Sequence, residues 1–193
     1  SPDRHFEQFT SQLFQEEMTG STLNMHYTIA DPKTFGISEY EPVLPIYHSD
    51  QPEDSKEHCS DLLHRLDRID PDRLSPENAY TYRLLHRSLE NDLALADFPY
   101  YNEPLSPSSG MQSQLPVLLA EYTFRTKRDV TDYLALLDQI DDYFASLLLY
   151  EQEKAAAGFF MPACSSEKVR KQCDTIVTTE ELAQGTHFLQ TTF

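Results

Sequence analysis

The chain has 193 residues, of which 39% are hydrophobic and 11% aromatic; this content suffices for a folded core and excludes a disordered chain. Its formal net charge of -17 at pH 7 argues against nucleic acid and anionic membrane surfaces as partners, because both are bound through clustered Lys and Arg. No apolar run in the sequence approaches the roughly 18 residues that a membrane span requires.

The first predicted helices are bounded by clear start and stop residues. A capping serine followed by proline begins a helix at Ser1, and Gly20 ends it. A second helix begins at Ser21. The proline-containing segment from Asp31 to Pro52 is expected to be irregular apart from one helical turn after Asp31. The apolar residues of the first helix fall on one face: Phe6, Phe9, Leu13 and Phe14.

Two longer helices follow, joined by a short connection. One starts at Glu53 and is broken at Asp70-Pro71. The next starts at Ser75, whose hydroxyl can accept a first-turn N–H, and ends near Ala96. The short connection predicts an antiparallel pair. Apolar residues recur at helical spacing in both helices: Cys59, Leu62, Leu63, Leu66 and Ile69, then Tyr82, Leu85, Leu89 and Leu93.

A long proline-rich loop is predicted over about residues 97–114. A short helix is expected to begin at Leu115 or Pro116 and to end at Tyr122. A last helix is expected from Ser165 or Ser166 to Val177.

Between the short helix that ends at Tyr122 and the last helix, the pattern predicts one very long helix over about residues 127–157. Thr126 and Asp129 form a capping signal at its start, and Gly158 ends it. At 1.5 Å per residue such a helix is about 45 Å long. No segment shows the alternation of a strand. The prediction is therefore an all-α fold, an elongated helical bundle that forms a single all-helical region over residues 1–193.

The end of the sequence carries apolar residues without a polar tail or a cap. We expect Phe193 to be a cut inside a longer protein, of which this chain is the N-terminal part. Phe188, Leu189 and Phe193 should then be exposed or pack against a neighbouring molecule.

No motif for catalysis or metal binding is present in the sequence. None of the 7 histidines begins a His-Glu-x-x-His zinc motif. The nearest grouping, His58 and His64, lies on different faces of a helix, so solvated histidines are the expectation. Paired carboxylates of the predicted long helix, Asp138, Asp141 and Asp142, are expected on a hydrated face, and a hydrolase built on them is a remote alternative.

The three cysteines do not form a zinc ribbon or a Cys-x-x-Cys motif. Cys59, Cys164 and Cys173 are expected to be buried, unpaired thiols, and they leave the redox compartment open.

The loop region from Tyr100 to Gln114 is the best candidate for recognition. It places neutral hydrogen-bonding groups beside aromatic side chains, which suits peptide or saccharide binding. The alternative is a rigid connector whose tyrosines pack under the bundle. We take Tyr101, Gln112 and Gln114 as candidates for contacts in a substrate cleft.

Four blocks of the sequence resemble the bacterial family named domain of unknown function 885. They are Phe6 to Ile37, Ser75 to Leu93, Leu105 to Tyr122, and Tyr133 to Gly158 with Pro162 after it. The block LSPSSGMQSQLPVLLAEY is the most similar to the family. The resemblance covers nearly the whole chain, as the N-terminal third of a longer family member.

The resemblance implies an all-helical fold related to the gluzincin peptidases, with a deep cleft between two helical halves. In such proteins the His-Glu-x-x-His helix lies in the later half, so no catalytic or metal residue is carried over to this chain. Zinc is expected only in the full-length parent, and this chain should be inactive alone. The implied partners are the C-terminal catalytic region of the same polypeptide and a peptide substrate. The implied location is extracellular or in the cell envelope, as a lipoprotein whose signal segment is absent from this chain.

The lack of catalytic motifs leaves a second hypothesis open. The chain would then be a stand-alone, all-helical extracellular binding or scaffold module without enzymatic activity. Acidity ordinarily serves solubility, and attraction of cationic peptides is the functional alternative.

Overall fold

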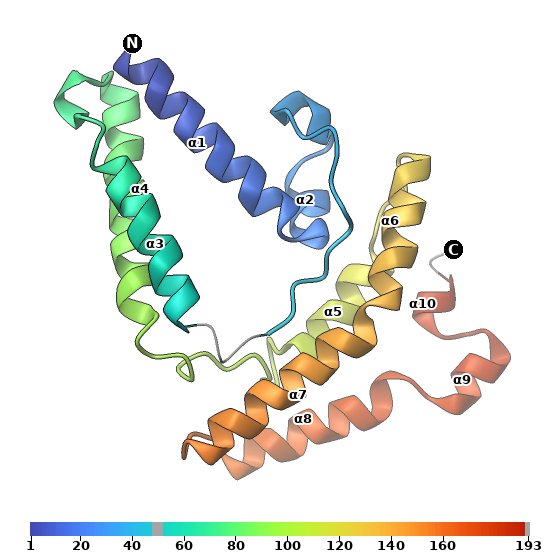
Figure 1. The fold of residues 1–193 in the computed structure, drawn as a ribbon. Coiled ribbons are helices and arrows are strands. Elements are labelled where there is room, and N and C mark those ends of the chain that lie inside the picture. Colours follow the sequence, from blue (N-terminus) through green and yellow to red (C-terminus); the bar gives the residue numbers. More distant parts are fainter. Residues whose placement is uncertain (48–51, 192–193) are drawn as a thin grey trace. The chain divides into compact units, whose positions relative to one another are not determined.

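The computed structural model describes residues 1–47 and 52–191. All regular secondary structure in these described residues is helical, which confirms the predicted fold class. The chain divides into two compact units (Figure 1). Unit 1 comprises Ser1–Glu41 and His48–Tyr101, and unit 2 comprises Pro42–Tyr47 and Asn102–Phe193. None of the described helices is both long and apolar enough to cross a membrane.

The described residues of unit 1 form four α-helices and two 3-10 turns. Serine caps begin three of its helices, because the hydroxyl of Ser1, Ser21 or Ser75 accepts a backbone N–H of the first turn, in each case over 3.3 Å. These starts were predicted from the sequence. The elements are α1 (Pro2–Thr19), α2 (Thr22–Thr28), η1 (Pro32–Phe35), α3 (Pro52–Leu66), η2 (Pro71–Arg73) and α4 (Pro76–Leu95).

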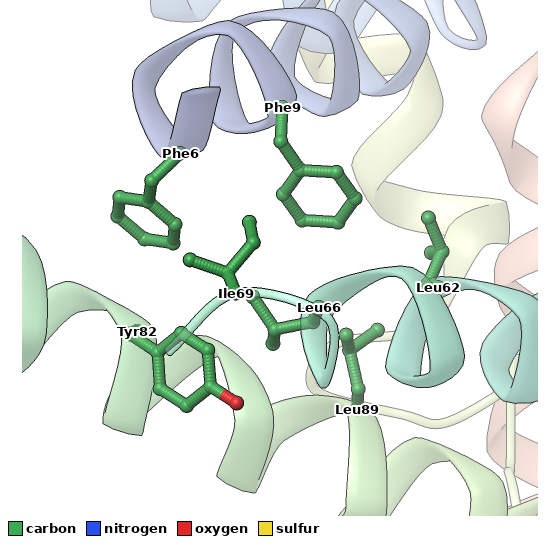
Figure 2. Packing of buried hydrophobic residues seen from close by; sticks show 7 residues of the cluster. All are labelled: Phe6, Phe9, Leu62, Leu66, Ile69, Tyr82 and Leu89. Carbon is green, nitrogen blue, oxygen red and sulfur yellow. The ribbon is translucent and has the colours of Figure 1, made fainter. Parts of the chain in front are cut away.

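The core of unit 1 lies between the first half of α1 and the antiparallel pair α3–α4 (Figure 1). Figure 2 shows Phe6 and Phe9 of α1 pointing toward the side chains of that pair. The buried cluster consists of Phe6, Phe9, Leu62, Leu66, Ile69, Tyr82 and Leu89. All of its members belong to the apolar faces that the periodicity predicted.

Unit 2 contains the remaining six helices. They are α5 (Met111–Ala120), α6 (Lys127–Asp138), α7 (Ile140–Ala156), α8 (Ala163–Ile176), α9 (Thr179–Gln184) and α10 (Phe188–Thr191). Helix α5 packs against α8 and α10. Thr126 caps α6 in a capping box with Asp129, as its sequence predicts.

The predicted single helix over 127–157 is divided in the structure, because α6 ends at Asp138 and α7 begins at Ile140. The interruption falls at Gln139. Its backbone N–H bonds the carbonyl of Leu136, three residues back, over 3.1 Å, which tightens the turn. Its side-chain amide donates to the carbonyl of Pro42 over 3.0 Å and accepts from the N–H of Leu44 over 2.9 Å. Gln139 thereby holds the segment Pro42–Tyr47 beside the two helices.

The predicted loop over 97–114 is shorter in the structure, because α5 begins at Met111 rather than near Pro116. Gly110 is the N-cap, and its carbonyl accepts the backbone N–H groups of Ser113 and Gln114 over 3.0 Å each. Pro116 lies inside the helix, where its missing N–H removes one helical bond. The sequence suggested Pro116 as a first-turn residue, and this interpretation was wrong.

The last part of the described chain contains two short helices, α9 and α10, that periodicity did not predict. Phe188 is 38% exposed, as expected. Leu189 is half-buried and lines a cavity with residues of α5, α7 and α8, so it packs within the chain. Phe193 lies outside the described residues.

Candidate functional site

The three predicted cleft residues have different surroundings. Tyr101 is the last residue of unit 1 and is 83% exposed. Gln112 and Gln114 both lie in the first turn of α5 in unit 2. Gln114 is exposed, but Gln112 is only 2% exposed and therefore cannot contact a substrate directly. Gln112 and Gln114 therefore differ in their access to solvent.

Gln112 holds the loop that precedes α5. Its Nε2 donates to the carbonyl of Ser106 over 2.7 Å and to Oε1 of Gln172 over 2.9 Å. Gln172, on α8, donates in turn to the carbonyl of Pro107 over 2.9 Å. Because both partners of Gln112 Nε2 are acceptors, the orientation of the amide is determined by the network. Two glutamines from different helices therefore bind consecutive carbonyls of the loop.

Gly110 allows the loop to come this close to α5. Its φ of -74° is accessible to any residue, so the requirement is space rather than backbone conformation. A Cβ at this position would lie 2.0 Å from Oε1 of Gln112 and 2.3 Å from the backbone N of Ser106. The loop is also closed internally, since Ser109 N donates to Ser106 Oγ over 3.2 Å and Gly110 N donates to Ser106 O over 3.0 Å.

A buried lysine of α7 holds the start of the same loop. Lys154 is 4% exposed, and its Nζ donates to the carbonyl of Asn102 over 2.9 Å and to Oε2 of Glu103 over 2.6 Å. The hydroxyl of Tyr150 donates to the carbonyl of Asn102 over 3.2 Å. A lysine that is desolvated in this way needs such an anionic partner, because an uncompensated buried charge is strongly unfavourable.

Glu151 completes the buried charged cluster. It is 8% exposed, and neither of its carboxylate oxygens has a hydrogen-bond donor among the described residues. Burial, with the negative charge of Glu103 as a second cause, raises the pKa of Glu151 to about 7 from its ordinary 4.5, although Lys154 opposes the shift. Glu151 therefore changes its protonation near neutral pH, next to the salt bridge that anchors the loop.

The sequence reasoning did not select Glu103, Glu151 or Lys154. A signal for two of them was present in α7, because Leu147, Tyr150, Glu151 and Lys154 follow one another at spacings of three, one and three residues. This spacing places both ionisable residues on the buried face of a helix. No comparable signal identifies Glu103, whose role depends on the path of the loop.

The histidines and acidic residues considered for metal binding or catalysis do not converge. The residues that the structure describes contain no group of three or more His, Cys, Asp or Glu side chains suited to a metal ion. His64 Nε2 lies 3.0 Å from Nη2 of Arg68, which follows it by four residues in the sequence. Asp138, Asp141 and Asp142 are all exposed, as expected for a hydrated face.

The prediction for the cysteines was wrong in part. All three thiols are free, but Cys164 and Cys173 are exposed and only Cys59 is half-buried. Cys164 occupies the first turn of α8, where the helix begins after Pro162. Burial raises the pKa of the Cys59 thiol, with the nearby charge of Asp92 as a second cause.

Comparison with protein families identifies the chain. Residues 33–192 match the model of a family described as bacterial protein of unknown function, DUF885. The chain belongs to this family. No curated protein and no solved structure matches it. The DUF885 match includes the anchored loop, the charged cluster of α7 and all six helices of unit 2, whereas α1 and α2 precede it.

Proposed function

We propose that this chain is a non-catalytic helical portion of a zinc metallopeptidase-like hydrolase and that unit 2 forms one wall of its substrate cleft. The single observation that carries the proposal is the anchoring of residues 102–110. Lys154, Tyr150, Gln112 and Gln172 bind carbonyl groups of this loop from three helices. A surface that recognises a peptide backbone benefits from such a fixed loop, because little conformational entropy is then lost on binding.

The outer side of the anchored loop has the chemistry that peptide recognition requires. Asn102, Ser108 and Ser109 are exposed, and so is Gln114 at the adjoining start of α5. These side chains are neutral and can both donate and accept hydrogen bonds. We assign Gln114 as a substrate contact and retain Tyr101, on unit 1, as a second candidate. Gln112 becomes a positioning residue that acts through the loop.

The remaining parts of the proposal derive from the family resemblance. The partner of this chain is the catalytic region of the same polypeptide, located C-terminal to it, and that region carries the zinc ion. The substrate is a peptide. The protein acts outside the cell or in the cell envelope, where it is held as a lipoprotein.

The test uses the full-length protein isolated from its source cells. We expect bound zinc by elemental analysis and hydrolysis of unstructured peptides that a chelator abolishes. Gln114→Ala should raise KM about fivefold with little change in kcat, since the loss of one hydrogen bond is worth about 1 kcal/mol. Gln152→Ala, at an exposed glutamine of α7, is the matched control and should leave both constants unchanged.

The opposite result supports the alternative hypothesis. A native protein that contains no zinc and hydrolyses no peptide, but that binds another macromolecule through this chain, would be a binding or scaffold module. If the protein is a zinc peptidase but Gln114→Ala leaves KM unchanged, the enzymatic part of the proposal holds. The cleft wall then does not lie at this part of unit 2.

A further inference from the structure

Unit 1 contains an open groove that the proposed function does not use. It lies between α1, α3 and α4 and has a volume of about 510 Å³. Its apolar lining residues include Leu13 and Phe14 of α1, Leu62 of α3, and Leu84, Leu85 and Leu89 of α4. All lining residues belong to unit 1, so the groove is a property of that unit alone.

The groove follows from the way α1 meets the other helices. Phe6 and Phe9 are buried against the α3–α4 pair, but Leu13 and Phe14, one to two turns later, are only half-buried. Figure 1 shows α1 diverging from the pair toward α2. Leu13 packs at the edge of that core, and Phe14 packs against the second cluster of unit 1 and the ring of Phe35. The parts of both side chains that stay accessible line the groove.

The charges around the groove select the kind of occupant. Its charged lining residues are Glu17 on α1 and Asp92 on α4, with His58 on α3 as the third ionisable group. Among the lining residues that the structure describes there is neither lysine nor arginine. Apolar surface between two carboxylates favours a ligand that combines apolar side chains with positive charge, and it disfavours an anionic lipid.

The dimensions of the groove select a helix. Along α4 its lining extends from Thr81 to Asp92, which is about 16 Å at 1.5 Å per residue. An incoming helix of three turns has the same length. Thr81 and Ser88 on this wall are short side chains, which allows the backbone of such a helix to approach α4 closely.

We propose that this groove binds an amphipathic helix of a partner protein whose polar face is basic. Leucine-type side chains of the partner enter between α1 and α4, and its Lys or Arg residues pair with Glu17 and Asp92. This is the helix-in-groove mode of recognition. The proposal is independent of the cleft wall in unit 2.

The experiment measures binding of a fluorescent 14-residue peptide of Leu and Lys with amphipathic helical spacing, by anisotropy, with this chain. We expect saturable binding at micromolar concentrations. The same peptide with Glu in place of Lys should bind at least about tenfold more weakly. Ser88→Trp fills the groove and should also reduce binding about tenfold, whereas Gln152→Trp, at an exposed site of unit 2, should have no effect.

Charge variants distinguish binding of the peptide in the groove from nonspecific attraction of a basic peptide to an acidic protein. The double variant Glu17→Gln and Asp92→Asn should weaken binding, and the double variant Asp141→Asn and Asp142→Asn, with the same change in net charge, should not. Equal weakening by both would overturn the proposal, as would equal binding of the Lys and Glu peptides. If Ser88→Trp impairs folding, Leu84→Lys provides the second test, because Leu84 is 55% exposed and lines the groove. Unchanged binding by a folded variant of either kind overturns the proposal.

Discussion

Unit 1 and unit 2 are both helical, but their interiors differ in chemistry. The main cluster of unit 1 consists of seven apolar side chains, with Phe6 and Leu66 among the most deeply buried. Unit 1 also buries the polar residues Thr22 and His26, whereas the buried polar set described in unit 2 includes carboxylates and a lysine: Gln112, Asp132, Glu151, Lys154 and His187. Several of them contact segments far away in the sequence, such as Lys154 with Asn102. Apolar periodicity thus accounts for the main cluster of unit 1, whereas the interior of unit 2 also depends on buried charged and amide groups.

The largest expected effect tests the apolar core of unit 1. Leu66→Ala should lower the free energy of unfolding by about 4 kcal/mol, because Leu66 is 0% exposed and its removal leaves a cavity between α1, α3 and α4. Leu95→Ala, at a 56% exposed site of α4, should cost less than about 0.5 kcal/mol. Urea unfolding measures the change in the free energy of unfolding. Hydrogen exchange should show that backbone amides lose protection mainly in unit 1. Equal loss in α7 would show that the two units unfold together.

The next effect tests the charged cluster of unit 2. Lys154→Met should lower the free energy of unfolding by about 3 kcal/mol at pH 8, because Glu103 and Glu151 then face each other without a cation. The loss should be smaller at pH 5, where Glu151 is protonated. Lys168→Met, at an exposed site of α8, is the control. A loss independent of pH would show that packing of the lysine stem, rather than charge, stabilises this region.

A third prediction compares one glycine from each unit. Gly110→Ala should cost about 2 kcal/mol, since its Cβ would overlap the backbone of Ser106, which would have to move. Gly20→Ala, at the end of α1, should change stability by less than about 0.5 kcal/mol, because its φ is -71° and the nearest atom, the carbonyl oxygen of Glu16, would be 3.3 Å away. Thermal unfolding of both variants measures the difference. Similar values for the two would contradict the close approach that we describe at Gly110.

The elements of unit 1 were predictable because their signals are local. The serine caps at Ser1, Ser21 and Ser75 bind N–H groups three residues away, and the apolar faces repeat within single helices. The all-helical class and the capping box at Thr126 followed from the same kind of pattern.

Two features of unit 2 were predicted wrongly, the single long helix and the start of α5, because both depend on contacts that the sequence of the helix itself does not show. The interruption at Gln139 accompanies hydrogen bonds to Leu44 and Pro42, which lie 95 and 97 residues away in the sequence. The early start of α5 depends on the fit of Gly110 against Ser106. Of the three predicted contacts, Gln112 is buried and Tyr101 belongs to unit 1, and Gln114 stays a proposed contact.

The smallest effects concern pH, and they should have opposite signs in the two units. In unit 1, Asp3 accepts hydrogen bonds from Ser75 N over 2.8 Å and from Asn78 Nδ2 over 2.7 Å. These bonds lower the pKa of Asp3 below its ordinary 3.8, with the backbone N–H of Ser75 as the largest cause. A carboxylate of this kind contributes stability above pH 3.8, and the contribution is lost as the pH falls through the lower, folded-state pKa.

Glu151 in unit 2 should behave in the opposite way. Its pKa is raised to about 7, so between pH 4.5 and about 7 the unfolded chain releases the proton before the folded chain does. Stability from this group therefore falls as the pH rises through that window and is constant on either side of it. Glu151→Gln, which keeps the shape without the charge, should remove this slope and raise Tm at pH 8 by a few degrees, as about 1 kcal/mol does in a chain of this size. Asp3→Asn should leave that slope intact and reduce only the loss of stability in strong acid. The measurement is Tm from pH 3 to pH 8 for both variants and for the unmodified chain. If Tm of Glu151→Gln changes with pH as Tm of the unmodified chain does between pH 4.5 and about 7, the cluster of Glu103, Glu151 and Lys154 does not make the stability of unit 2 depend on pH.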